Sequence, residues 1–255
     1  MSRDVLVLFE GRTEENTLKK LRKRKIIDYD KLEPTEPAEF HQKIKDLLYI
    51  RVLINQPICL VVLRDLDAQR KVDNIKKSTE DAVAKALAMA KIERKVELLQ
   101  HSAHPNVFFF KSYNPDFNIV LHIAQRRPIE GVPAFRNHTT DDYTFDLAMR
   151  TETIANLPEF KNAQKRNPTL TPEEIQRKIT SEIFGILKEN GIAVMEAKQF
   201  VNLYIAVLQI GGRGSLRYSE LPGKVIEHAK KKDIEEVFES WIAAFNTVKE
   251  EIHEM

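Results

Sequence analysis

An acidic motif near the start of the chain carries residue types that can bind a metal ion. The motif E-G-R-T-E (10–14) directly follows the apolar segment 4–9, whose valine and leucine residues are typical of a buried strand. Glu10 closes this segment, Gly11 permits a sharp turn, and Glu14 lies in the first turn of the helix expected next. Alone, the motif also describes an ordinary helix start whose acids suit the helix dipole.

A second acidic motif, Asp65-Leu66-Asp67, follows the apolar segment 58–63. Alone it is a common turn, but parallel strands end at the same edge of a sheet, where ligands bind. We therefore expect the carboxylates of Glu10, Asp65 and Asp67 to lie within about 4–7 Å of one another. Converging carboxylates repel unless a cation lies between them, and ligation by oxygen alone selects Mg²⁺ or Mn²⁺. Such ions also take phosphate oxygens, as in phosphodiester hydrolysis.

The elements that position these motifs alternate between strands and helices. The expected strands are 4–9, 25–30 (weak), 58–63 and 106–110, and helices are expected from Thr13, over 40–48 and over 79–100. This order predicts an α/β fold with a mostly parallel sheet flanked by helices.

Beyond about residue 140 the pattern predicts helices only. Thr171 followed by proline and two glutamates is a strong helix start, and Gly191 should end that helix. Further helices are expected over 200–210 and 234–248. We expect a metal-binding domain over 1–140 and an all-helical region over 141–255, which is either a separate domain or an extension packed on the sheet.

Composition narrows the functional classes. The net charge is only +2, so any nucleic-acid-binding surface must be local, as in the basic run 19–25. The single cysteine, Cys59, excludes a disulfide framework and is expected in the core. We find no signal peptide, no membrane-spanning segment and no phosphate loop, so we expect a soluble cytoplasmic protein without its own ATPase site.

The order strand–Glu10-Gly11-x-Thr13-Glu14 and strand–Asp65-x-Asp67 resembles the Toprim domain of topoisomerases, bacterial primases, recombination mediators and overcoming-lysogenization-defect (OLD) nucleases. Glu14 makes the likeness strongest to OLD-type nucleases and small stand-alone Toprim proteins, and it covers roughly residues 4–125. The resemblance implies that Glu10 is a metal ligand or general acid/base, that Asp65 and Asp67 are metal ligands, and that Glu14 serves a second metal.

Further site residues are expected after the fourth strand. Many relatives carry another acid there, at the start of a helix. Asp116 could supply this metal ligand, but if the matching position is Asn118 the second metal site is incomplete. Lys111 could neutralise a phosphate, and it is a candidate nucleic-acid contact together with Arg12 and Arg64, which flank the acidic motifs.

These features predict an endonuclease that uses Mg²⁺ or Mn²⁺ to hydrolyse phosphodiester bonds in DNA or RNA. By resemblance it would act in antiviral defence, with a separate ATPase as partner. The apolar face with Phe238, Trp241, Ile242 and Phe245 could contact that partner, another copy of the chain, or the core. The main alternative is a non-catalytic Toprim module that binds nucleic acid or supports assembly, and a third is a nucleotidyl transferase.

Two other features are given structural interpretations. The histidines of His101-x-x-His104 are expected at the surface, because no third metal ligand accompanies them. The glycine-rich segment 211–215 follows a helix instead of a strand, so a flexible connection is expected there in place of a phosphate-binding loop.

Overall fold

A computed structural model describes residues 4–67, 70–125, 129, 131–135, 137–194, 196–210 and 216–250. The chain forms two compact units. The sheet unit comprises Met1–Glu15, Lys25–Ala124 and Glu239–Met255, and the helical unit comprises Asn16–Arg24 and Gln125–Phe238. The boundary expected near residue 140 therefore lies at 124–125, and the last helix returns to the sheet unit.

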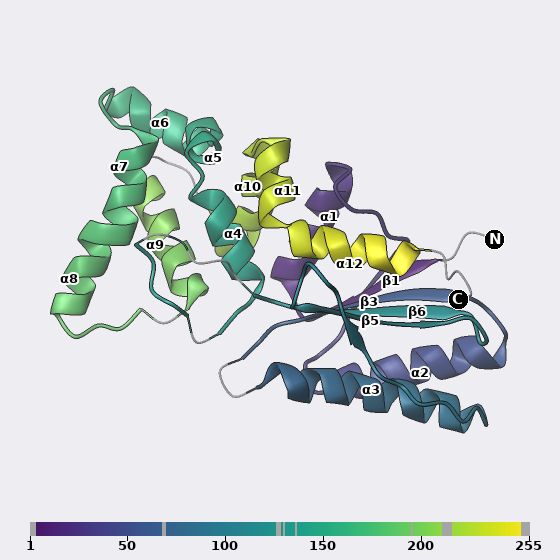
Figure 1. Ribbon diagram of the computed structural model, residues 1–255. Helices are drawn as coiled ribbons and strands as arrows, with labels where there is room; N and C mark the ends of the chain where they lie inside the picture. The colour runs from purple at the N-terminus through teal and green to yellow at the C-terminus, as the bar shows by residue number, and fades with distance from the viewer. Residues whose placement is uncertain are drawn as a thin grey trace. The chain divides into compact units, whose positions relative to one another are not determined.

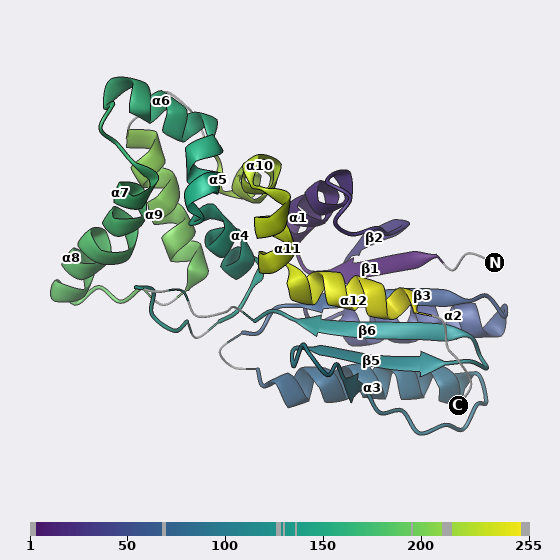
Figure 2. The same ribbon diagram turned by 45° about the horizontal axis from the view of Figure 1, so that its top comes forward.

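The sheet unit is built on a mostly parallel sheet, which confirms the predicted α/β class. Over the described residues the strand order is β2-β1-β3-β6-β5-β4. The strands are β1 (Val5–Phe9), β2 (Lys31–Pro34), β3 (Ile58–Arg64), β4 (Leu99–Gln100), β5 (Val107–Ser112) and β6 (Phe117–Ile123). The first three and β6 run parallel, whereas β5 is antiparallel to both of its neighbours (Figure 2).

Helices connect the parallel strands. The helix α1 (Arg12–Lys23) follows β1, α2 (Phe40–Leu53) links β2 to β3, and α3 (Val72–Met89) follows β3. The chain thus moves from β1 to β2 on one side and then crosses to β3 on the other. The carboxyl ends of the neighbouring strands β1 and β3 therefore form a topological switch point, where open α/β sheets bind their ligands.

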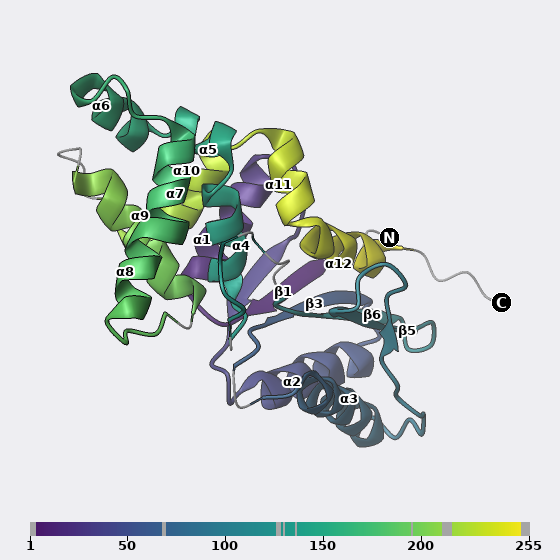
Figure 3. The same ribbon diagram turned by 60° about the vertical axis from the view of Figure 1, so that its left-hand side comes forward.

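The two faces of the sheet bury different residues. Helices α2 and α3 pack together on one face, and α12 (Glu239–Lys249) packs on the other against β3, β5 and β6 (Figures 1 and 3). Alternate strand residues serve the two faces. The α2–α3 face holds an apolar cluster that includes Leu8, Phe40, Leu60, Phe117 and Leu121.

Several predicted elements are displaced. The second strand is Lys31–Pro34 and not 25–30, α3 ends at Met89 and not near residue 100, and Leu99–Gln100 is a strand. The helix expected over 234–248 is divided into α11 (Lys231–Val237) and α12. The stretch after β5, where a helix was expected, is a turn followed by β6.

The helical unit is arranged around α4 (Thr140–Ala148), which contacts α5, α9, α10 and α11. Its other helices are α5 (Thr151–Asn156), α6 (Pro158–Arg166), α7 (Pro172–Arg177), α8 (Phe184–Glu189), α9 (Ala197–Ile210), α10 (Leu221–His228) and α11, with a π-helical turn (Lys178–Ile183) and a 3₁₀ turn (Tyr218–Glu220). As predicted, the Thr171 side chain caps α7, and Gly191 has a positive φ of 72°.

Three further expectations concern the apolar face around Trp241, the position of Cys59 and a membrane span. Phe238, Trp241 and Phe245 are buried within the chain and Ile242 is half-buried, as expected for core residues. Cys59 is buried and its thiol donates to the carbonyl of Val248. Among the described helices, none is long and apolar enough to cross a bilayer.

Candidate functional site

Glu10 and Asp65 lie side by side at the carboxyl edge of the sheet. Strands β1 and β3 are parallel neighbours in the register Leu8↔Val62, so both acids follow the ends of adjacent strands. The amide of Asp65 lies 3.4 Å from Glu10 Oε1. The predicted common edge is therefore present, and it coincides with the switch point between β1 and β3.

The carboxylate of Glu10 is held by Arg64. Arg64 Nε donates to Glu10 Oε1 at 2.8 Å, and both side chains are largely buried. Burial raises the pKa of Glu10 above its ordinary value of 4.5, and the charge of Arg64 opposes that rise. The nearby charge of Asp67 adds slightly to the rise. Glu10 is thus a partly desolvated carboxylate with a cationic partner.

Arg64 was expected to contact nucleic acid, but its side chain is largely buried. Its guanidinium lies over the Phe40 ring, 4.1 Å from the centroid, and only 7% of the side chain is exposed. Its Nη2 lies 3.5 Å from the carbonyl of Pro37. Arg64 therefore links the acidic edge to the start of α2, which the sequence pattern did not indicate.

The two aspartates differ in exposure. Asp65 is half-buried, whereas 50% of the Asp67 side chain is exposed, with Arg70 Nε 3.7 Å from its Oδ2. Within the described part of the chain, no group of three or more acidic, histidine or cysteine side chains is placed to hold a metal. The predicted convergence of Glu10, Asp65 and Asp67 on one ion is therefore not assembled.

These residues fit a hard divalent cation by their chemistry and by their common edge. All are carboxylates, the ligands that Mg²⁺ and Mn²⁺ prefer. Their arrangement does not fit a preformed three-carboxylate site, because the guanidinium of Arg64 supplies the positive charge next to Glu10. An ion that used all three carboxylates would share Glu10 with Arg64, which bonds to Oε1 of that carboxylate.

Glu14 and Arg12 lie at the start of α1. Glu14 is buried, and its Oε2 lies 3.1 Å from the position that a Cβ would take at Gly11. The absence of a side chain at Gly11 therefore lets the Glu14 carboxylate fold back over the turn. Arg12 is exposed at the first position of the helix.

Asp116 and Lys111 do not join this site. Phe117 pairs with Ile58 at the start of β3, whereas Asp65 follows Arg64, which pairs with Ile123 at the other end. At about 3.3 Å per residue this register separates Asp116 from Asp65 by roughly 25 Å. Asp116 therefore does not lie at the edge that holds Glu10 and Asp65, because β5 is antiparallel and ends at the opposite edge of the sheet.

Lys111 also lies at the amino edge of β6. It pairs with Asn118 across β5 and β6, and its ammonium forms an ion pair of 2.8 Å with Glu250. Asn118 is a buried strand residue whose amide donates to the carbonyl of Val248. Lys111 therefore lies away from Glu10 and Asp65, and the Asn118 amide bonds within the chain.

A pocket of about 230 Å³ opens beside Arg64 on the α2–α3 side of the sheet. Its lining is formed by Pro37, Ala38, His41, Arg64, Arg70, Asn74, Ile75 and Ser78. Only Arg64 was singled out from the sequence. Arg70 follows Asp67 by three residues, so the pattern R-D-L-D-x-x-R was the available signal.

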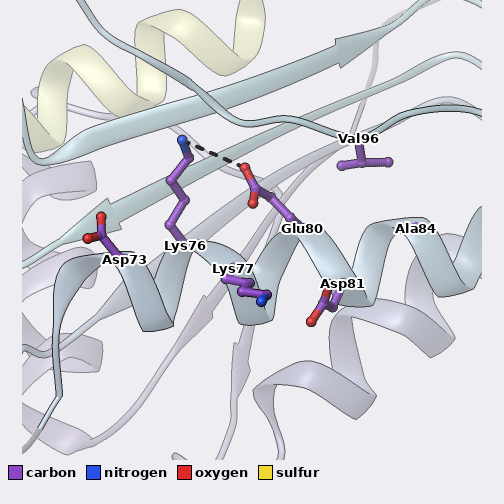
Figure 4. Close-up of a pocket in the computed structure, with 7 residues that line it drawn as sticks. All are labelled: Asp73, Lys76, Lys77, Glu80, Asp81, Ala84 and Val96. Carbon is purple, nitrogen blue, oxygen red and sulfur yellow. Dashed lines mark ion pairs between the residues drawn. The ribbon is translucent and has the colours of Figure 1, made fainter.

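A second pocket, of about 380 Å³, lies along α3 and is shown in Figure 4. It is lined by side chains of both charges, namely Asp73, Lys76, Lys77, Glu80 and Asp81, together with Ala84 and Val96. The ammonium of Lys76 lies 3.7 Å from Glu80, and Glu80 also accepts from the amide of Leu98. These charges largely cancel, so this pocket has no preference for an anionic or cationic ligand.

The remaining sequence motifs have structural positions or lie outside the described residues. In the basic run, Lys20 pairs with Glu227, and Arg24 donates to the carbonyls of Glu227 and Ala229 at the end of α10. The rings of His101 and His104 lie in contact at a tilt of 40°, with 5.0 Å between their centroids. The glycine-rich segment 211–215 lies outside the described residues.

No family model, no curated protein and no solved structure matches the chain. The likeness to Toprim proteins therefore depends on the two acidic motifs and on their positions in the sheet.

Proposed function

We propose that this protein is a Toprim-like nuclease that hydrolyses phosphodiester bonds of DNA or RNA with a divalent metal ion. The observation that carries the proposal is the position of Glu10 beside Asp65 at the switch point between β1 and β3. Asp67 follows on the same segment, so three carboxylates belong to one edge of the sheet. The parallel arrangement of β2, β1, β3 and β6 supports the likeness to the Toprim fold.

In this proposal Asp65 and Asp67 hold a Mg²⁺ or Mn²⁺ ion, with Glu10 as the third ligand or as the group that moves a proton. When bound, the ion polarises the phosphate and lowers the pKa of the attacking water. Burial raises the pKa of Glu10, which favours a role in proton transfer. Arg64 holds the Glu10 carboxylate in place, and Glu14 lies one helical turn beyond Gly11 as a further acid.

The proposal is tested by incubating the purified chain with Mn²⁺ and plasmid, single-stranded DNA or tRNA. We expect the wild type to cut at least one substrate and Asp65→Asn to lose about 100-fold or more of that activity. Because the substitution removes one of several neighbouring negative charges, the melting temperature without metal should not fall.

Asp46→Asn is the matched control, because Asp46 lies on the exposed side of α2 and bonds only to Gln42 and Lys45 among the described residues. It should retain wild-type activity. Loss of folding in Asp65→Asn would identify Asp65 as a turn residue, and a wild type that cuts none of the three substrates would refute the nuclease.

The second candidate is a non-catalytic Toprim-like module that binds nucleic acid. The Glu10–Arg64 ion pair favours this candidate. The buried guanidinium already neutralises the carboxylate of Glu10, so a metal ion is not needed for that purpose. A module of this kind binds nucleic acid in EDTA and cuts nothing in Mn²⁺. Binding and cleavage measured on the same preparation distinguish the two candidates.

A role in antiviral defence and a separate ATPase partner remain predictions from the resemblance. Their physical motive is that an ungated nuclease would damage the cell, and the sequence contains no phosphate loop with which to gate it. Overexpression of the chain alone, followed by plasmid and RNA integrity measurements, checks this point. A vigorous nuclease that cells tolerate would remove the need for a partner.

A further inference from the structure

We infer that the pocket beside Arg64 binds a phosphate group of the nucleic-acid strand that the acidic edge acts on. The inference rests on the proposed function for the identity of the strand. The pocket holds about 230 Å³, enough for a phosphate group together with part of its neighbouring sugar or water. Its side chains and the helix ends beside it favour an anionic ligand over a neutral or cationic one.

The lining of the pocket has positive groups and no negative ones. Two arginines, Arg64 and Arg70, contribute charge, and Asn74 and Ser78 contribute polar side chains. None of the lining residues is acidic, although Asp65 and Asp67 lie nearby in the chain. An anion in the pocket would therefore meet two guanidinium groups, each of which also pairs with an acid of the neighbouring edge, Arg64 with Glu10 and Arg70 with Asp67.

Arg64 has hydrogen-bonding capacity left for a ligand. Its Nε donates to Glu10 and its Nη2 makes a long contact of 3.5 Å with the Pro37 carbonyl. Among the described residues, Nη1 has no hydrogen-bond partner, although only 7% of the side chain is exposed. Nη1 is therefore available to donate to an anion in the pocket, and hydrogen bonds from a guanidinium to a phosphate are charge-assisted and strong.

The backbone adds to the positive potential. Both α2 and α3 begin at this edge, and neither N-cap residue, Glu39 or Lys71, makes a side-chain cap. His41 lies in the first turn of α2, and Asn74 lies in the first turn of α3. Helix N-termini attract phosphate because their amides lack partners. Here they act together with the buried arginine.

The imidazole of His41 lies between the carbonyl of Ser78 and the ammonium of Lys85. Its Nδ1 lies 3.0 Å from the carbonyl of Ser78, which can only accept, so Nδ1 carries the proton. Its Nε2 then accepts from the ammonium of Lys85 at 3.3 Å. Lys85 is exposed and adds a positive charge to the same side of α3.

Arg64 also explains why this phosphate would lie next to the reacting bond. The same guanidinium lines the pocket and bonds to Glu10. A phosphate bound in the pocket and the Glu10 carboxylate would therefore both contact the Arg64 side chain. We therefore assign the pocket to a phosphate neighbouring the one that is cut, with Arg64 and Arg70 as positioning residues.

The test measures binding of a fluorescent 12-nucleotide single strand to the full chain in EDTA, so that neither metal nor cleavage enters. Asn74→Asp adds a negative charge inside the pocket at a helix position that tolerates aspartate, and it should weaken binding at least about 10-fold. Arg70→Gln should weaken binding about 3- to 10-fold and reduce the salt slope by about 1.

Arg51→Gln is the matched control, because Arg51 lies in the last turn of α2 and bonds to Gln56. It should change affinity less than about 2-fold, which isolates the pocket from net charge. Equal binding by Asn74→Asp, Arg70→Gln and Arg51→Gln would overturn the inference, whether or not the protein later proves to be a nuclease.

Two further probes identify the source of the phosphate. A strand with an uncharged methylphosphonate backbone should bind at least about 10-fold more weakly than the natural strand. Inorganic phosphate should compete only at millimolar concentrations. Tight binding of inorganic phosphate, with no effect of Asn74→Asp on the natural strand, would contradict a nucleic-acid phosphate.

Discussion

The sheet buries polar side chains in two places, and the two places differ in what those side chains bond to. On the α12 face, Cys59 and the amide of Asn118 donate to the carbonyl of Val248, and His122 bonds to Ser240 at 3.0 Å. At the carboxyl edge, Glu10 and Arg64 bond to each other beside a pocket. The first group joins α12 to β3 and β6, whereas the second lines a pocket that a ligand can enter.

The difference indicates which buried polar groups serve stability. On the α12 face the thiol of Cys59, the amide nitrogen of Asn118 and the His122 ring bond to groups of the chain, whereas the buried Asn118 Oδ1 has no hydrogen bond among the described residues. At the edge, the pKa of Glu10 is raised and half of the Asp67 side chain remains exposed. Closed networks stabilise a fold, whereas perturbed and partly open groups are typical of functional sites.

The largest effect on stability should come from the α12 face. Trp241 is 1% exposed, and its indole lies edge-on to the His122 ring at 5.7 Å between centroids. Trp241→Ala should lower the free energy of unfolding by about 3–5 kcal/mol, measured by urea denaturation. Tyr113→Ala, at an aromatic residue that is 58% exposed, is the control and should change it by less than about 1 kcal/mol. A small loss for Trp241→Ala would contradict a stabilising role for the α12 face.

A smaller effect should appear as a pH dependence. Burial lowers the pKa of His122 from 6.5 to about 3, so the folded protein keeps this histidine neutral. The unfolded chain binds its proton below about pH 6.5, and stability is therefore lost as the pH falls from 6.5 toward 3, by at most about 1.4 kcal/mol per pH unit. His122→Gln keeps an acceptor for Ser240 but cannot titrate.

The measurement for His122 is the melting temperature of both proteins between pH 7 and pH 4. Wild type should lose stability faster than His122→Gln as the pH falls, because only the histidine contributes this linkage. Parallel curves for the two proteins would contradict a buried neutral His122. Carboxylates elsewhere contribute equally to both proteins, so the difference between the curves is the relevant quantity.

The sequence predicted the parts of the fold that local patterns specify. The apolar segments around Val7 and Val61 became β1 and β3, and the acids that follow them share one edge. It missed β6 because Asn118 and His122 interrupt the apolar run. Their partners, Val248 and Ser240, lie more than a hundred residues later, and no local pattern contains that information.

The site could be predicted only in part for a similar reason. Parallel strands end at the same edge of a sheet, so the proximity of Glu10 and Asp65 could be predicted from the two strand patterns. The ion pair of Arg64 with Glu10 and the pocket that includes Arg70 depend on side-chain packing between α2, α3 and β3. Asp116 was misplaced because β5 runs antiparallel, which moves the end of that strand to the opposite edge.

The most direct test of the proposed metal site is a crystal structure of the protein soaked in Mn²⁺, with the ion located by its anomalous scattering. We expect a peak at the carboxyl edge, bonded to Asp65 and Asp67 at about 2.0–2.3 Å, with Glu10 turned from Arg64 toward the ion. An intact Glu10–Arg64 ion pair with no peak among these carboxylates, at a Mn²⁺ concentration that supports cleavage, would contradict it.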